Sequence, residues 1–112
     1  MSNSYINANE ELHRLDGPAV EWANGTKEWW INGQRHRIDG PAIEYADGTK
    51  SWWIDGKLHR IDGPAIEYAN GRKSWWINDK EVTNEVNNWL SENNVTYPFD
   101  EDGLVLFKMR WL

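Results

Sequence analysis

The sequence predicts a mainly β protein built from repeated antiparallel hairpins, with a short C-terminal helix. The chain repeats with a period of 23 residues, marked by His13, His36 and His59, and such a period is typical of an array of small structural units. Each copy contains turn-forming residue pairs. Between the turns lie short segments rich in aromatic and β-branched residues, which favour strands. We expect successive hairpins to lie side by side in one elongated, twisted sheet.

The repeats occupy residues 5–82. Each of the three copies starts with His-Arg and runs through Asp-Gly-Pro-Ala to a Trp-Trp-Ile segment. Tyr5-Ile6-Asn7 resembles a degenerate Trp-Ile-Asn and indicates a partial copy at the N-terminal end. Asn-Gly and Asp-Gly tolerate positive φ, so they predict two-residue hairpin turns. These turns are expected at Asn24-Gly25, Asp47-Gly48 and Asn70-Gly71, with further candidates at Asn32-Gly33 and Asp55-Gly56. The segment KLHRI, at 57–61, is a candidate for a short third strand.

The length of each turn decides which residues share a face of the sheet. A two-residue turn at Asn24-Gly25 pairs Val20 with Trp29 and places these two on the core face. Neighbouring strand residues point to opposite faces, so the second Trp of each pair lies on the other face. A change of one residue in the turn exchanges the two faces. With the predicted turn, the exposed indoles are Trp30, Trp53 and Trp76, and the core-facing ones are Trp29, Trp52 and Trp75.

Residues 83–112 are expected to cap the array, and the whole chain, 1–112, is expected to form one domain. Apolar residues at helical spacing predict a short helix that begins at an N-cap of Thr83 or Asn84 and ends near Asn93-Asn94. This helix would lie over the core face as a lid or cap. The last segment, LVLFKMRWL at 104–112, alternates and therefore predicts a final strand. The helical stripe consists of Val82, Val86, Trp89 and Leu90.

Composition narrows the classes of function. The formal net charge of −6 argues against a nucleic-acid-binding surface and against attraction to anionic membranes. The sequence holds no apolar run long enough to span a bilayer. The absence of Cys rules out disulfides and Cys-ligated metals. The N-terminal residues lack the pattern of a signal peptide, and we therefore expect a cytoplasmic location.

The order of turn glycine, aromatic strand, Asn-Gly or Asp-Gly and His, at a 23-residue period, resembles the MORN repeat family. The resemblance covers about two thirds of the chain, and it implies β-hairpins stacked into an elongated sheet that serves binding or scaffolding. The sequence departs from the family by carrying Trp-Trp-Ile where the family has Tyr-x-Gly, and His-Arg-Ile-Asp-Gly-Pro where it has His-Gly-x-Gly. In this it is similar to divergent MORN variants of phages and giant viruses. That likeness implies a phage accessory protein that binds and inhibits a host defence factor in the host cytoplasm.

The candidate binding residues are the row Trp30, Trp53 and Trp76, because a contiguous patch of exposed aromatic residues is typical of a docking surface. Arg37 and Arg60 are expected to lie across these rings as cation–π partners. The acidic row that includes Glu44 and Glu67 would bias this face towards a basic partner. Alternatively, both faces of the sheet are covered within the protein and the indoles are purely structural.

The His-Arg-x-Asp segments do not predict catalysis, since an active site is one asymmetric constellation and these segments occur three times. Equivalent atoms in successive hairpins lie roughly 9–10 Å apart, too far for the three histidines to share a metal ion. We expect Asp to accept hydrogen bonds at the Gly-Pro turn and Arg to pair with it. The chain is therefore predicted to be no enzyme and to use no cofactor or metal.

Three functions remain open. The first is a non-enzymatic interaction module with a host protein as its partner. The second is sequestration of a small nucleotide by Trp- and Arg-lined pockets in a homo-oligomer, using Arg35, Arg37 and Arg60. The third is a self-assembling structural protein, because open sheet edges and aromatic faces favour oligomers.

Overall fold

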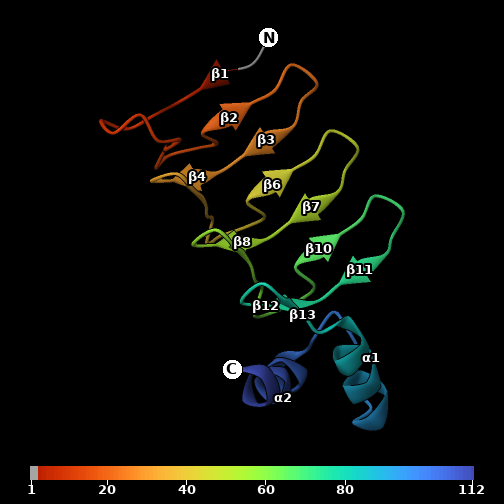
Figure 1. Cartoon of the computed structure of the whole chain (residues 1–112). Coiled ribbons are helices and arrows are strands. Elements are labelled where there is room, and N and C mark those ends of the chain that lie inside the picture. Colours follow the sequence, from red (N-terminus) through yellow and green to blue (C-terminus); the bar gives the residue numbers. More distant parts are fainter. Residues whose placement is uncertain (1–2) are drawn as a thin grey trace.

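The computed structural model describes residues 3–112 and shows an elongated array of hairpins followed by two helices (Figure 1). Its principal dimensions are 48 × 28 × 23 Å. The predicted fold class, repeated antiparallel hairpins with a helical C-terminal end, is confirmed.

The main sheet has seven short antiparallel strands in the order β1-β2-β3-β6-β7-β10-β11. Each copy contributes one hairpin, and the second strand of a hairpin pairs with the first strand of the next, as β3 does with β6 and β7 with β10. The array therefore grows by one hairpin per repeat. The bounds are β1 (Asn3–Ser4), β2 (Val20–Glu21), β3 (Lys27–Glu28), β6 (Ile43–Glu44), β7 (Lys50–Ser51), β10 (Ile66–Glu67) and β11 (Lys73–Ser74).

A second set of hairpins lies along the opposite edge of the array (Figure 1). These are β4 (Trp30–Ile31) with β5 (Gln34–Arg35), β8 (Trp53–Ile54) with β9 (Lys57–Leu58), and β12 (Trp76–Ile77) with β13 (Lys80–Glu81). Their two-residue turns match the prediction for Asn32-Gly33 and Asp55-Gly56, with positive φ at both positions. Successive turns are joined by backbone hydrogen bonds, such as Gly56 N–H to the Arg35 carbonyl at 2.9 Å.

The turns at Asn24-Gly25 and its equivalents differ from the prediction. They contain three residues, so Trp22 N–H donates to the Thr26 carbonyl at 2.8 Å and Val20 pairs with Glu28 rather than Trp29. The Asn24 carboxamide accepts the Thr26 N–H at 3.0 Å, and Gly25 has φ of 96°. This is the three-residue hairpin geometry with glycine in the left-handed region. The slip of one residue exchanges the faces assigned to the paired tryptophans.

The partial N-terminal copy also aligns one residue away from its predicted place. Tyr5 N–H donates to the Ala19 carbonyl, just as Trp29 N–H donates to the Ala42 carbonyl. Tyr5 therefore occupies the position of the first Trp of each pair, rather than the second. The Arg14 guanidinium lies 4.1 Å from the centre of the Tyr5 ring.

The first helix, α1 (Thr83–Glu92), confirms the predicted apolar stripe, but its N-cap is Val82 rather than Thr83 or Asn84. The Thr83 hydroxyl is engaged elsewhere, because it accepts Trp75 N–H at 2.9 Å and donates to the Glu81 carboxylate at 2.9 Å. The helix follows β13 at the end of the array (Figure 1). It caps the array and does not lie over a face of the sheet as a lid.

The predicted final strand is wrong, because residues 101–111 form a second helix, α2 (Glu101–Trp111). Asp100 is its N-cap and accepts Gly103 N–H at 2.7 Å. Gly103, Phe107 and Trp111 recur every four residues, and this stripe faces inward, with Gly103 and Phe107 buried. Spacing by four therefore outweighs the alternation that suggested a strand.

The apolar core lies where the last hairpin meets the helices. Its buried members are Trp75, Val82, Val86 and Phe107. Aromatic rings of the C-terminal segment surround Trp75, with ring centres 5.3–5.9 Å away. Partly buried residues packed against this cluster are Ile77, Trp89, Leu90, Tyr97, Phe99 and Trp111.

Candidate functional site

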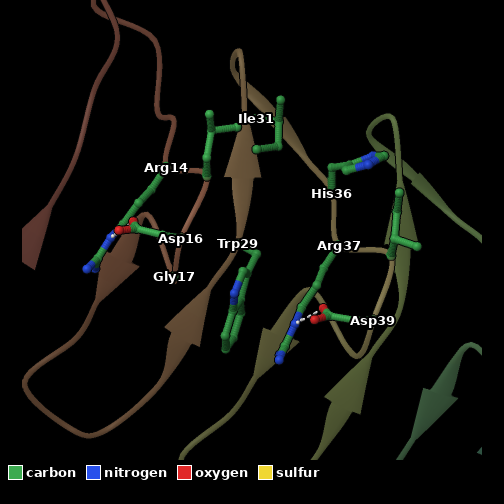
Figure 2. A pocket seen from close by; sticks show the side chains of 10 residues that line it. Arg14, Asp16, Gly17, Trp29, Ile31, His36, Arg37 and Asp39 are labelled. Carbon is green, nitrogen blue, oxygen red and sulfur yellow. Dashed lines mark hydrogen bonds and ion pairs between the residues drawn. The ribbon is translucent and has the colours of Figure 1, made fainter.

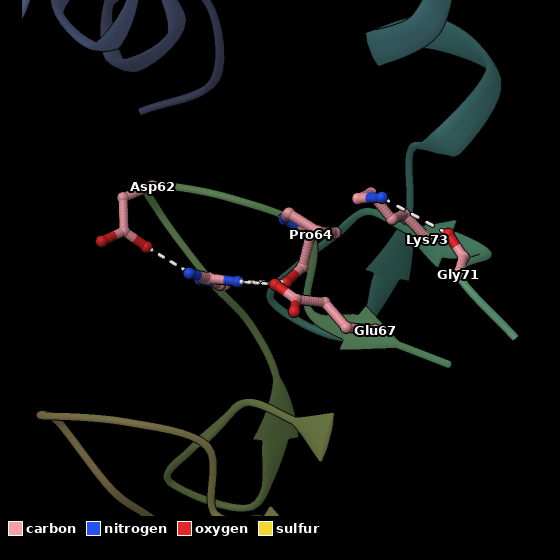
Figure 3. Close-up of polar contacts among 6 residues, drawn as sticks. Asp62, Pro64, Glu67, Gly71 and Lys73 are labelled. Carbon is pink, nitrogen blue, oxygen red and sulfur yellow. Dashed lines mark hydrogen bonds and ion pairs between the residues drawn. The ribbon is translucent and has the colours of Figure 1, made fainter. Parts of the chain in front are cut away.

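Each His-Arg-x-Asp segment folds into a loop closed by its arginine. Arg37 Nε donates to Asp39 at 3.0 Å and Arg37 Nη1 donates to the Pro41 carbonyl at 3.1 Å. A third bond runs from Arg37 Nη1 to Glu44 at 2.9 Å. The equivalent guanidinium of Arg60 joins Asp62 and Glu67, at 2.9 and 2.8 Å (Figure 3). The predicted pairing of Arg with Asp is therefore confirmed, and each of these two cations is held between two carboxylates.

The three histidines connect neighbouring copies. The Nδ1 atoms of His13, His36 and His59 accept the backbone N–H of the turn residue 19 positions later, each at 3.0 Å. Only an unprotonated nitrogen can accept such a bond. Burial lowers the pKa of His59 below its ordinary value of 6.5. These contacts give the histidines a structural role.

The arginines lie across a different row of indoles from the one expected. Arg37 lies 3.8 Å from the centre of the Trp29 ring, and Arg60 lies 3.8 Å from that of Trp52. In the predicted row, Trp30 and Trp53 instead meet Arg35, whose guanidinium lies between their rings at 4.7 and 5.1 Å from the ring centres.

Trp30, Trp53 and Trp76 are half-buried and point to the same side of the sheet as Val20 and its equivalents. Each indole N–H donates to the side chain two residues earlier: Trp53 Nε1 to Ser51 Oγ at 2.9 Å, and Trp76 Nε1 to Ser74 Oγ at 3.0 Å. A second, more exposed row on this side runs beside them, one ring per copy. We call the two rows together the aromatic face: Trp22, Trp30, Tyr45, Trp53, Tyr68 and Trp76.

The four charged residues of the predicted site lie on the opposite side, which we call the charged face. Glu44 is paired in register with Lys27 and Lys50, and Glu67 is paired with Lys50 and Lys73. The structure therefore separates Glu44, Glu67, Arg37 and Arg60 from the Trp30 row and places them beside Trp29 and Trp52. An acidic bias acting on the Trp30 row is not supported by this placement.

The charged side also carries two open grooves that the sequence reasoning missed. The Trp29 groove lies between the loops of Arg14 and Arg37 (Figure 2). The Trp52 groove lies between the loops of Arg37 and Arg60. Their volumes, about 690 and 610 Å³, fall in the range typical of ligand sites. The assumed two-residue turn had assigned both tryptophans to the core, so the grooves could not be foreseen.

Within residues 3–112 there is no cluster of His, Cys, Asp and Glu side chains suited to a metal ion. In the same part of the chain no helix combines the length and apolar character needed to cross a bilayer. No family model matches this chain, and neither does any curated protein or solved structure. The geometry of the two faces is thus the basis for any functional proposal.

Proposed function

We propose that this protein is a non-enzymatic interaction module that binds a partner protein through its aromatic face. The observation that carries the proposal is the exposed row of rings contributed one per repeat, Trp22, Tyr45 and Tyr68. Tyr45, Trp53, Leu58, Ile66 and Tyr68 together line one shallow depression in this face. A contiguous apolar surface with a few polar groups is typical of protein docking sites.

The two tryptophans of the first copy on this face are well suited to a protein contact because hydrogen bonds hold them in fixed orientations. Trp22 Nε1 donates to Glu28 at 2.6 Å, and Trp30 Nε1 donates to the other oxygen of the same carboxylate at 3.1 Å. Rigid aromatic side chains lose little conformational entropy on binding and are enriched among residues that dominate interface energies. The partner surface that fits is apolar, since Glu28 and Arg35 on this face already pair with each other at 3.4 Å.

The alternative functions have less support from the geometry. Arg37 and Arg60 are each neutralised by two carboxylates, which leaves little positive charge to attract a nucleotide phosphate. Self-assembly would use the sheet edges at β1 and β11, and it stays a prediction. A phage origin and a host defence factor as the partner also stay predictions.

The test is affinity capture from a candidate host lysate with three immobilised proteins: wild type, Tyr45→Ser/Tyr68→Ser, and the matched control Val105→Ser/Met109→Ser. Both pairs of replaced side chains are exposed, so all three proteins should fold. We expect one protein to be retained by wild type and control and lost from the Tyr variant. Titration of that purified partner should then show affinity reduced by at least roughly tenfold, since hot-spot truncation costs ~2 kcal/mol. Equal retention by all three would contradict the proposal.

A further inference from the structure

Each of the three Arg loops is followed by a tryptophan, and the space between loop and tryptophan is open in the first two copies, where the next Arg loop forms the far wall. No Arg loop follows the third copy, because Val82-Thr83 replaces His-Arg there. The Trp29 groove is floored by Trp29 and Ile31, and the Trp52 groove by Trp52 and Ile54. The repeat places Trp75 and Ile77 at the same positions in the third copy. There the site is filled by the chain itself, through the segment Tyr97-Pro98-Phe99.

The filling segment contacts the third tryptophan with both of its rings. Tyr97 meets Trp75 edge-to-face, with ring centres 5.3 Å apart and planes at 83°, and Phe99 lies 5.9 Å from Trp75. The two rings also meet each other at 5.4 Å. Such edge-to-face pairs add to the stabilisation from apolar burial. Trp75 is consequently only 3% exposed, whereas Trp29 and Trp52 are partly exposed.

The Tyr97 hydroxyl lies over the glycine of the third Arg loop. A Cβ added to Gly63 would lie 2.7 Å from the Tyr97 hydroxyl oxygen and 2.8 Å from Arg60 Cζ. Burial raises the pKa of the Tyr97 hydroxyl, against the opposing charge of Arg60. Gly17 and Gly40 occupy the same place in the open grooves. There the three atoms nearest to an added Cβ all belong to the arginine of the same loop. The space taken by a tyrosine hydroxyl in the third copy is therefore also present in the other two.

The rims of the open grooves carry unusually exposed aliphatic side chains. Leu15 and Ile38 are 83% and 84% exposed, while Ile61, which also lines the Trp52 groove, is 40% exposed. Large apolar side chains exposed in this way beside a concave surface are typical of binding sites. Ile38 lines both open grooves, and Leu15 lines only the Trp29 groove.

We infer that the Trp29 and Trp52 grooves each bind a short bent segment of a partner protein, like Tyr97-Pro98-Phe99, that carries tyrosine and a second aromatic residue two positions later. The third copy shows the mode of binding: one ring packs edge-on against the floor tryptophan with its hydroxyl over the loop glycine, and the next ring packs beside it. This site lies on the charged face, so it does not rest on the proposed role of the aromatic face.

The test uses the full-length protein labelled with ¹⁵N and the blocked hexapeptide VTYPFD, which has the sequence of residues 95–100. The indole N–H resonances of Trp29, Trp52 and Trp75 are assigned with single Trp→Phe variants. We expect saturable shifts at Trp29 and Trp52, with no shift at Trp75. The peptide VTAPAD, which lacks both rings, should shift none of the three.

Exposed variants test where the peptide binds without altering the core. Ile38→Ser should weaken binding at both grooves by roughly tenfold, because it removes an apolar side chain that the peptide would cover. Leu15→Ser should weaken binding at the Trp29 groove alone. Met109→Ser, an exposed change in α2, serves as the matched control and should leave both affinities unchanged.

Three outcomes would overturn the inference. The first is no saturable shift at Trp29 or Trp52 in wild type up to the solubility limit of the peptide. The second is equal binding of VTYPFD and VTAPAD. The third is a concentration-dependent dimer of the protein that Tyr97→Ala abolishes, which would make the occupant the same segment of a second copy. Failure here leaves the aromatic-face capture experiment unaffected, because its variants lie on the other side of the sheet.

Discussion

The third repeat and the first two contain nearly the same residues but differ in how their tryptophans are covered. Trp75 is enclosed by Tyr97, Phe99 and Phe107, whereas Trp29 and Trp52 have an arginine on one side and an open groove on the other. A single sheet cannot bury both of its sides alone. Each repeat thus supplies a half-site, which is an Arg loop and a tryptophan with one uncovered side. The C-terminal segment covers that side only in the third copy.

The same comparison separates two kinds of stabilisation. At the C-terminal end the contribution comes from apolar burial around Phe107 and Val86, both fully covered. In the first two copies the buried apolar side chains are smaller, such as Val20 and Ile43. A repeated ladder of polar contacts joins the copies, as where Asp55 N–H donates to His36 Nδ1. Ion pairs with an exposed partner contribute little individually. We therefore expect the first two copies to open at lower free energy than the capped end.

The largest expected effect on the free energy of unfolding comes from truncating the first tryptophan of a pair, in the third copy or in the second. Trp75→Ala should lower the free energy of unfolding by about 5 kcal/mol, at the upper end of the range for buried aromatic residues. Trp52→Ala should cost roughly half as much, because the Trp52 ring has lost less contact with water. Denaturant unfolding followed by far-ultraviolet circular dichroism measures both. Equal losses would show that the open groove stabilises its tryptophan as well as the cap does.

A second pair of variants sharpens the role of the cap. Phe107→Ala should cost about 3–4 kcal/mol, while Val105→Ala should stay within about 0.5 kcal/mol of wild type. Of these two residues of α2, Phe107 is buried and Val105 is exposed. In a strand, residues 105 and 107 would share one face and respond alike. Thermal and denaturant unfolding of the two variants therefore also distinguish helix from strand at this segment.

Much of the architecture was predictable because the repeat period and the turn residues determine it. The 23-residue spacing of His13, His36 and His59 indicated stacked hairpins, and Asn32-Gly33 correctly marked a two-residue turn. The α1 stripe was equally clear from Val86 and Trp89. These features depend on local periodicity and local turn chemistry, which a single sequence displays directly.

The site was less predictable, because it depends on turn length and on distant contacts. Asn24-Gly25 fits a two-residue and a three-residue turn, and the Asn24 side-chain bond to Thr26 N–H accompanies the longer one. One extra residue exchanged Trp29 and Trp30 between faces. The packing of Tyr97 on Trp75 joins residues 22 apart, and nothing in the local sequence indicates it. In α2 the alternation of Val105 and Phe107 obscured the four-residue spacing from Phe107 to Trp111.

A smaller loss of stability is expected from substituting the glycines of the Arg loops. These substitutions test whether Tyr97 fills the space beside the third loop. Gly63→Ala forces a Cβ against the Tyr97 hydroxyl and should cost about 1–3 kcal/mol through overpacking. In Gly40→Ala the nearest atom is the Arg37 guanidinium carbon at 3.0 Å, the mobile end of a long side chain, so the loss should be smaller. The indole N–H resonance of Trp75 should move only in the Gly63 variant. A comparable loss in both variants would place the constraint in the arginine rather than in Tyr97.

The smallest expected effect is a pH dependence of stability at the join between the second and third copies, where His59 accepts Asn78 N–H. Because burial lowers the pKa of His59 from 6.5, the unfolded chain binds this proton more readily than the folded one. The stabilisation is therefore complete above pH 6.5 and is lost as the pH falls through that value towards the folded-state pKa. Protonation of Nδ1 would also remove the acceptor for Asn78 N–H. The variant His59→Asn does not titrate in this range, so its free energy of unfolding between pH 7.5 and 5 should fall less steeply than that of wild type, and parallel slopes would assign the acid sensitivity to other groups.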